Sequence, residues 1–183
     1  PDGLYLNDMN LFKDIDGQAY LLYSIGTNTQ FVISRLTSDY LQTSGTYITP
    51  AVLAGREAPA MILRNGVYFL LTSGLSGWAP NENKYSTSTS VMGTWSSLTD
   101  PFQTSVLEDR LTAYHSQTTD IQHVPGRGDA YIYIGDRFDY SNTLAGSLYY
   151  SRHIWLPMTF PTNNTMSITW EPTWNLDTVF PTV

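Results

Sequence analysis

Three polar residues stand at matching places ahead of three turn glycines, and their types suit acid–base chemistry. Asp8 and Glu57 each lie nine residues before such a glycine, and Gln117 lies eleven residues before the glycine of a longer turn. A carboxyl group that holds a proton can act as a general acid at a glycosidic bond, and a second polar group can hold a water. Equivalent positions in a repeat would converge on one pocket, so we expect these three residues to be catalytic.

Glu57 is the strongest candidate for the general acid. It is one of only four glutamates and directly precedes the apolar run 58–62. A carboxyl group in apolar surroundings has a raised pKa, so we expect Glu57 to stay protonated near neutral pH. The alternative is a structural ion pair with Arg56, although adjacent residues on a strand point to opposite faces.

The other candidates have both a functional and a structural interpretation. Asp8 could orient a sugar hydroxyl or tune the general acid, or it could simply form a turn. Gln117 could hold a water or a hydroxyl, or it could be a hydrogen-bonded core amide. Trp78, in a loop of turn residues, could stack on a sugar ring or anchor the loop in the core. Ser76 and Asn28 complete the expected substrate-binding residues.

The composition favours a neutral ligand. The formal net charge is −7, which argues against nucleic acid and anionic membranes as partners because both need a basic surface. The chain has no cysteine, so it can form neither a disulfide nor a thiolate metal site. Its three histidines lack metal-ligand spacing, so we expect no metal and no cofactor. No apolar run is long enough to cross a membrane.

The elements that must carry these residues are strands. Helical periodicity is nearly absent, and short runs rich in Tyr, Ile and Val alternate with turn residues, which is typical of an all-β chain. Three hairpins are predicted, over residues 9–24, 59–73 and 118–135. Their turn glycines lie 49 and 62 residues apart, a period typical of propeller blades, so we expect about three blades. The alternative is a β-sandwich with three similar hairpins.

Six segments in one order resemble glycoside hydrolase family 43, in the branch of the exo-β-1,3-galactanases (galactan 1,3-β-galactosidases). The segments span nearly the whole chain and are residues 7–20, 56–60, 72–81, 116–119, 133–137 and 155–157. The resemblance implies a five-bladed β-propeller and inverting hydrolysis. It also implies that Glu57 is the general acid, that Asp8 contacts or orients the sugar, and that Trp78 lies by the sugar. Gln117 matches a place where this branch carries an amide instead of the base carboxylate.

Two positions depart from the family pattern. Ser76 stands where the family leads us to expect Thr, and Asn7 stands where it leads us to expect Arg. We expect Asp136 and Arg137, which follow the last predicted strand, to form a structural ion pair.

The resemblance also predicts the organisation and the activity. Residues 1–183 correspond to the C-terminal blades of the catalytic domain, so we expect N-terminal blades to be missing and the isolated chain to be a poor hydrolase. The predicted activity is inverting exo-hydrolysis of β-1,3-galactan, a side-chain polymer of arabinogalactan, by an extracellular (secreted) protein. Another family 43 specificity, such as arabinofuranosidase or xylosidase, and a non-catalytic carbohydrate-binding propeller fragment are the alternatives.

Overall fold

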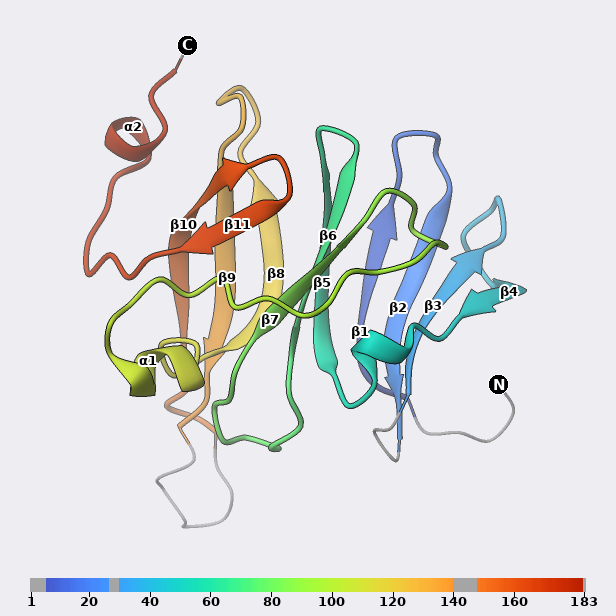
Figure 1. The fold of residues 1–183 in the computed structure, drawn as a ribbon, viewed down its shortest axis with the longest axis horizontal. Helices are drawn as coiled ribbons and strands as arrows, with labels where there is room; N and C mark the ends of the chain where they lie inside the picture. The colour runs from blue at the N-terminus through green and yellow to red at the C-terminus, as the bar shows by residue number, and fades with distance from the viewer. Residues whose placement is uncertain (1–5, 27–29, 140–147, 183) are drawn as a thin grey trace. The chain divides into compact units, whose positions relative to one another are not determined.

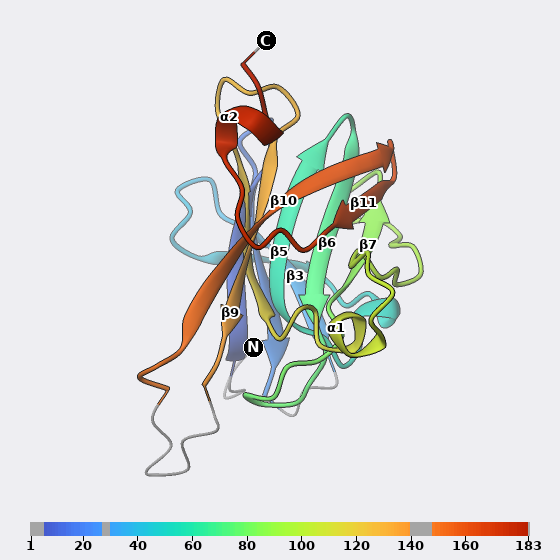
Figure 2. The same ribbon diagram turned by 90° about the vertical axis from the view of Figure 1, so that its left-hand side faces the viewer.

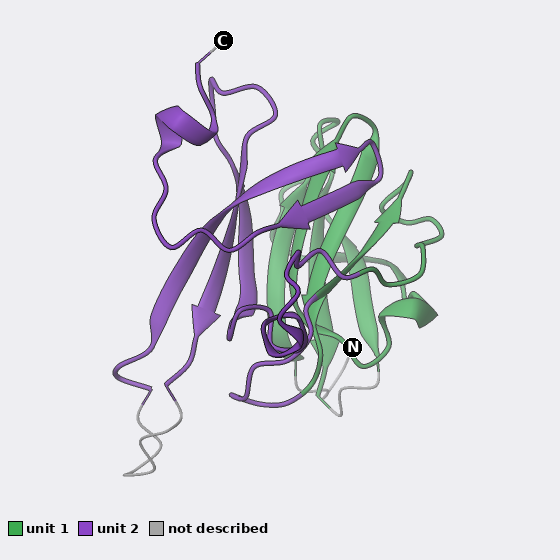
Figure 3. Cartoon of the chain, turned by 60° about the vertical axis from the view of Figure 1, so that its left-hand side comes forward, with its two compact units in different colours: residues 1–75, 84–99 green, residues 76–83, 100–183 purple. Residues whose placement is uncertain are grey.

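The computed structural model describes residues 6–26, 30–139 and 148–182, and these residues form an all-β chain with three antiparallel sheets. The candidate Asn28 lies outside the described residues. The chain divides into two compact units, which are coloured separately in Figure 3. Unit 1 comprises residues 1–75 and 84–99, and unit 2 comprises residues 76–83 and 100–183.

The first sheet of unit 1 is a four-stranded meander (Figure 1). Its strands lie in the order β1 (Leu6–Lys13), β2 (Ala19–Ile25), β3 (Phe31–Leu36) and β4 (Thr43–Ile48). The first hairpin turns at the predicted Asp-Gly pair, where Gly17 has a φ of +87°, a conformation that glycine adopts without steric cost.

The second sheet of unit 1 has three strands, preceded by a short 3₁₀ helix. The elements are η1 (Ala51–Leu53), β5 (Glu57–Arg64), β6 (Val67–Ser73) and β7 (Lys84–Ser88). Asn65 and Gly66 both have positive φ, as the Asn-Gly turn of a tight hairpin requires. The two sheets share one apolar cluster, in which Leu22, Leu53 and Leu70 are fully buried.

Unit 2 contains the third sheet and two short helices. Its elements are α1 (Leu107–Leu111), β8 (Gln117–His123), β9 (Tyr131–Arg137), β10 (Arg152–Thr162), β11 (Thr165–Ile168) and α2 (Leu176–Val179). The strand order is β11-β10-β9-β8, and the 11-residue strand β10 pairs with β9 over its first part and with β11 over its second (Figure 2). The helices have five and four residues, too few to show an apolar period in the sequence.

The three predicted hairpins are confirmed as β1–β2, β5–β6 and β8–β9. Three separate sheets also contradict the alternative of a two-sheet sandwich. In every case the first strand of the sheet carries one of the candidate catalytic residues at its beginning.

Candidate active site

A β-bulge lies at the beginning of the first strand of each sheet. In β1 the extra residue falls at Asn7–Asp8, in β5 it falls directly after Glu57, and in β8 it falls two residues after Gln117. A bulge bends its strand and re-aims the nearby side chains, and bulges are common beside active sites. The three candidates are therefore matched in local backbone geometry as well as in their distance from a turn.

Glu57 opens β5 in a buried setting. Its residue is only 8% exposed, and the five residues that follow it are all buried. Ala58 adopts a φ of +49°, which is unusual for a residue with a Cβ and marks the bulge. The preceding Arg56 is equally buried, and its Nε donates to the Thr72 hydroxyl at 3.1 Å. The expected apolar flank of the candidate general acid is thus present.

Asp8 lies on the strand next to Glu57 within unit 1. Strands β1 and β5 contact one another, and the Asn10 side-chain amide donates to the Pro59 carbonyl at 3.0 Å. Asp8 itself is exposed. An exposed carboxylate can contact a ligand hydroxyl, and a buried carboxyl group on a contacting strand can exchange a proton.

A pocket of about 440 Å³ lies within unit 2, a size typical of small-molecule sites. Its lining combines aromatic, charged and amide side chains with a tight loop; the lining residues are Gly77, Trp78, Ala79, Pro80, His115, Ser116, Gln117, Asp136, Arg137, Phe138, Asp139, Tyr150 and Arg152. Two of the three sequence-predicted residues in this unit, Trp78 and Gln117, are in that set, whereas Ser76 is not.

Trp78 is presented by a loop rather than packed in the core. It is 57% exposed, and its ring packs edge-to-face with that of Phe138, with the centroids 4.9 Å apart. This exposure contradicts the alternative that Trp78 anchors the loop in the core. Ser76 stabilises the same loop, because its hydroxyl donates to the Ala79 carbonyl and accepts from the Asn81 amide at 2.6 Å.

Gln117 faces Asp136 across the β8–β9 ladder, and both residues line the pocket. Asp136 Oδ1 lies 2.7 Å from His153 Nδ1, while the Arg137 guanidinium lies 5.6 Å from the centroid of the Trp170 ring. The predicted Asp136–Arg137 ion pair is therefore wrong, because neighbours on a strand point to opposite faces. Asp136 was not predicted as a pocket residue, because counting the register outward from the hairpin turn places Gln117 opposite Arg137, and only the β-bulge between Thr118 and Asp120 shifts the partner to Asp136.

The predicted residues thus fall into two groups. Asp8 and Glu57 lie on contacting strands of unit 1, whereas Gln117 and Trp78 line one pocket of unit 2. Convergence of Asp8, Glu57 and Gln117 on a single site would join the two units, and it stays a prediction. Among the described residues, no three His, Cys, Asp or Glu side chains gather as a metal site would need. In the same ranges, no helix has the length and apolarity to cross a membrane.

Solved structures of similar proteins share this fold. A family 43 β-1,3-galactosidase with galactodeoxynojirimycin is 36% identical, with a TM-score of 0.83 over 95% of this chain and 48% of its own. A second β-1,3-galactosidase of the family is 31% identical, with a TM-score of 0.86 over 100% of this chain and 37% of its own. An exo-β-1,3-galactanase from Clostridium thermocellum is 34% identical, with a TM-score of 0.77 over 91% of this chain and 34% of its own.

The chain therefore spans about half or less of the length of the structures it matches. A comparison with curated protein sequences gave no match. The family's members are five-bladed propellers, and the prediction of an all-β, partial propeller with about three blades is confirmed. Residues 6–153 match the model of the glycosyl hydrolases family 43. Sequence, sheets and structural neighbours agree, and the chain belongs to glycosyl hydrolases family 43.

Proposed function

We propose that the chain is part of an exo-acting glycoside hydrolase that cleaves β-1,3-galactan with inversion. The observation that carries this proposal is Glu57, a buried carboxyl group at a bulge in a family 43 chain. The similar structures support the substrate, since they are named β-1,3-galactosidases and exo-β-1,3-galactanases, and one from Phanerochaete chrysosporium holds β-1,3-galactotriose.

In this proposal Glu57 donates its proton to the glycosidic oxygen as the bond to the leaving sugar breaks. Gln117 holds the attacking water on the opposite face of the sugar; an amide is a poor base, so it acts by positioning the water or through its imidic tautomer. Asp8 contacts a sugar hydroxyl, and the exposed indole of Trp78 stacks on a sugar face. We expect about 6.5–9.5 Å between the Glu57 carboxyl and the Gln117 amide, the separation of inverting pairs.

The test is Glu57→Gln in the complete enzyme of which the chain is proposed to be a part, assayed by galactose release from β-1,3-galactan. The amide has no proton to donate, so turnover should fall by about 10²- to 10⁴-fold. Substrates with an activated leaving group need less protonation and should lose less. Glu171→Gln, which changes an exposed glutamate in the same way, is the matched control. A Glu57→Gln variant with wild-type turnover on galactan would remove Glu57 from the mechanism.

A second candidate function is carbohydrate binding without hydrolysis. It is favoured by one observation: the pocket around Trp78 and Gln117 is lined entirely by residues of unit 2, which does not contain Glu57. Calorimetric titration with β-1,3-galactobiose, beside an assay for its cleavage, separates the two functions. Binding that depends on Trp78 and is never followed by cleavage would favour the binding function.

We also propose that the protein acts outside the cell, where a polymeric galactan is accessible. In support, the sequon at Asn163 lies in the exposed turn between β10 and β11, where an enzyme could attach a glycan. Fractionation of the native host with an antibody to the chain tests this directly. Recovery of the protein only from the cell interior would contradict it.

A further inference from the structure

Three consecutive residues in the left-handed conformation lie directly before Ser116–Gln117. Ala113, Tyr114 and His115 have φ of 49°, 55° and 58°. Even one residue with a Cβ rarely adopts this conformation, and three in a row are rarer still. Such a backbone persists only where the surroundings hold it in place. The strained turn therefore marks a place where the fold fixes the chain for a reason other than local preference.

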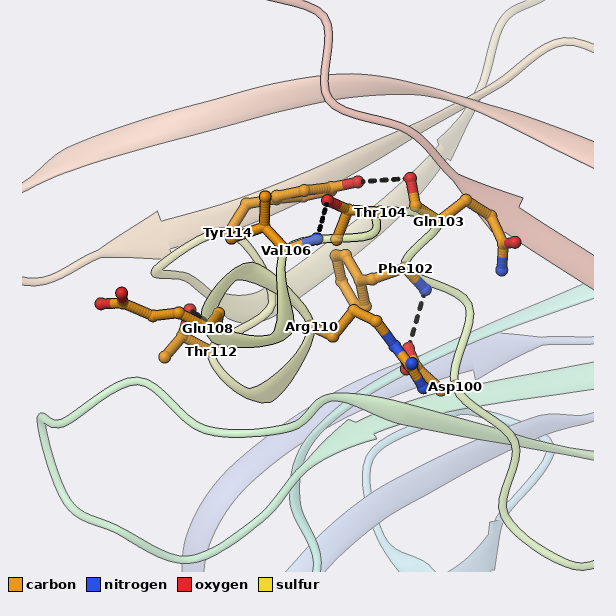
Figure 4. Close-up of polar contacts among 9 residues, drawn as sticks. All are labelled: Asp100, Phe102, Gln103, Thr104, Val106, Glu108, Arg110, Thr112 and Tyr114. Carbon is orange, nitrogen blue, oxygen red and sulfur yellow. Dashed lines mark hydrogen bonds and ion pairs between the residues drawn. The ribbon is translucent and has the colours of Figure 1, made fainter.

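The segment before the turn is held by contacts around α1 (Figure 4). The Thr112 hydroxyl donates to the Glu108 carbonyl at 2.7 Å, and the Tyr114 hydroxyl donates to the Gln103 carbonyl at 3.1 Å. A backbone bond from Tyr114 to the Asp109 carbonyl, 2.8 Å long, closes the end of the helix. These contacts fix where the turn begins.

The other side of the turn is held by a chain of hydrogen bonds whose direction is fixed. The Ala113 carbonyl can only accept, so the Ser116 hydroxyl donates to it at 2.6 Å. The Tyr133 hydroxyl then donates to Ser116 Oγ at 2.8 Å, and the Asn83 amide donates to Tyr133 Oη at 3.1 Å. Asn83, Ser116 and Tyr133 are at most 1% exposed. Because bonds in such a chain polarise one another, loss of one link weakens the others.

Strand β9 carries both Tyr133 and Gly135, and it leaves room for the Tyr133 ring. A Cβ on Gly135 would lie 2.6 Å from Tyr133 Oη and 2.8 Å from two ring carbons, closer than atoms can approach. Gly135 has no positive φ, so its backbone would accept other residues. The missing side chain at Gly135 instead leaves the space that the Tyr133 ring occupies.

We propose that Asn83, Tyr133 and Ser116 are positioning residues that hold Gln117 at the wall of the pocket. The hydrogen-bond chain ends at Ser116, which directly precedes Gln117 in the sequence. The Ser116 hydroxyl links this chain to the Ala113 carbonyl across the strained turn. Release of the turn would let the backbone of residues 113–115 relax and would move Gln117 away from its present place opposite Asp136 in the ladder. The catalytic consequence of this inference rests on the proposed function; the structural consequence does not.

The first test is Tyr133→Phe, which keeps the ring and removes only the hydroxyl. The probe is the side-chain amide ¹H–¹⁵N signal of Gln117, assigned by its absence in Gln117→Glu. We expect the signal to move by more than its line width in Tyr133→Phe. The matched control is Tyr23→Phe in unit 1, which removes another buried hydroxyl, 3.2 Å from Ser34 Oγ, and should leave the Gln117 signal in place.

Ser116→Ala breaks the same hydrogen-bond chain at its other end. This variant replaces Tyr133→Phe in the test if Tyr133→Phe does not fold. The double variant should displace the Gln117 signal no further than the larger single change, because both substitutions act on one chain. A Gln117 signal that stays in place in both variants, or that moves equally in Tyr23→Phe, would overturn the inference.

The second test is kinetic. In the complete enzyme with β-1,3-galactobiose, Tyr133→Phe should lower kcat by up to about 100-fold, as a misplaced catalytic group does, with little change in KM. Azide should restore turnover: it forms the new bond at the anomeric carbon as the C–O bond breaks, and the leaving sugar takes the proton from Glu57. Azide needs no water held by Gln117, and the product is α-galactosyl azide.

The two tests separate the inference from the proposed function. A displaced Gln117 signal in a chain that never cleaves galactobiose refutes the proposed function and leaves the positioning role intact. An active enzyme whose kcat falls in Tyr133→Phe without azide rescue, and whose Gln117 signal is unmoved, refutes the positioning role.

Discussion

The pKa of the Tyr133 hydroxyl depends strongly on the surroundings of the side chain. The residue is completely buried, and burial raises the pKa of its hydroxyl to about 12, while the hydrogen bond that the Asn83 amide donates to it acts in the opposite direction. The folded protein therefore keeps this proton at pH values where the unfolded chain, with a pKa near 10, has lost it.

The pH dependence of stability follows from that difference. Below pH 10 both states hold the proton, so the group adds no slope; between about pH 10 and pH 12 only the folded state holds it, and the free energy of unfolding falls as pH rises. Urea unfolding from pH 9 to pH 12 measures this. Tyr133→Phe, which has nothing to titrate, should show a shallower alkaline decline, and an identical decline in both proteins would contradict the assignment.

At this scale the sequence marks a residue where its type and its flanks are unusual. Glu57 stands out by its rarity and its apolar flank, and Trp78 by its loop of turn residues; Glu57 is buried and Trp78 is exposed, and their roles stay predictions. Asn83 and Ser116 carried no such signal, because a buried serine or asparagine looks like any turn residue until its partners are known. Asp136 was misassigned because its sequence neighbour, Arg137, lies on the opposite face of the strand.

At the scale of elements, the β-bulge in β5 requires an unusual backbone conformation, and its effect on stability can be tested. Ala58 has a φ of +49°, where glycine is comfortable and alanine is strained, whereas Ala60 in the same strand has no such φ. Ala58→Gly should therefore leave stability unchanged or raise it by about 1 kcal/mol. Ala60→Gly, at a fully buried position, is the matched control and should lower stability by about 1 kcal/mol.

Urea unfolding of the two variants measures the difference. If Ala58→Gly proved as destabilising as Ala60→Gly, the left-handed conformation at the bulge would not exist in solution. Turnover of the Ala58→Gly variant is a further measurement, because a more flexible bulge would orient the Glu57 carboxyl group less well.

The strands themselves were predictable because the hairpin turns carry strong local signals. Asp16-Gly17 and Asn65-Gly66 fix two hairpins through the positive φ that these residues tolerate. The bulges were not predictable, since an extra residue is visible only once two strands are paired in register. The eleven-residue spacing of Gln117 from its turn glycine, against nine in the other hairpins, reflects a longer turn between β8 and β9.

For the whole molecule, the charge balance predicts how ligand binding responds to salt. The net charge is −7, but a neutral galactose oligosaccharide has no charge for that field to act on. Its affinity should not change between about 0.01 M and 1 M ionic strength, although the Debye length falls from about 30 Å to about 3 Å. Titration calorimetry measures this.

Trp78→Ala is the companion measurement, because it removes the stacking surface and leaves the charge unchanged. It should weaken binding by about 1 kcal/mol or more at both salt concentrations. An affinity for the oligosaccharide that falls steeply with salt would mean that the true ligand is charged, and the assignment of a neutral galactan would then be wrong.

The close approach of Tyr133 to Gly135 has an evolutionary consequence. No residue with a Cβ fits at position 135 while an aromatic ring lies over it, so the two positions cannot mutate independently. Among related chains, a loss of the glycine should coincide with a smaller side chain at position 133, and such lineages should also be free to vary at positions 83 and 116. Covariation of positions 83, 116, 133 and 135 in an alignment of the family would show which lineages keep the hydrogen-bond chain at the pocket wall and which have lost it.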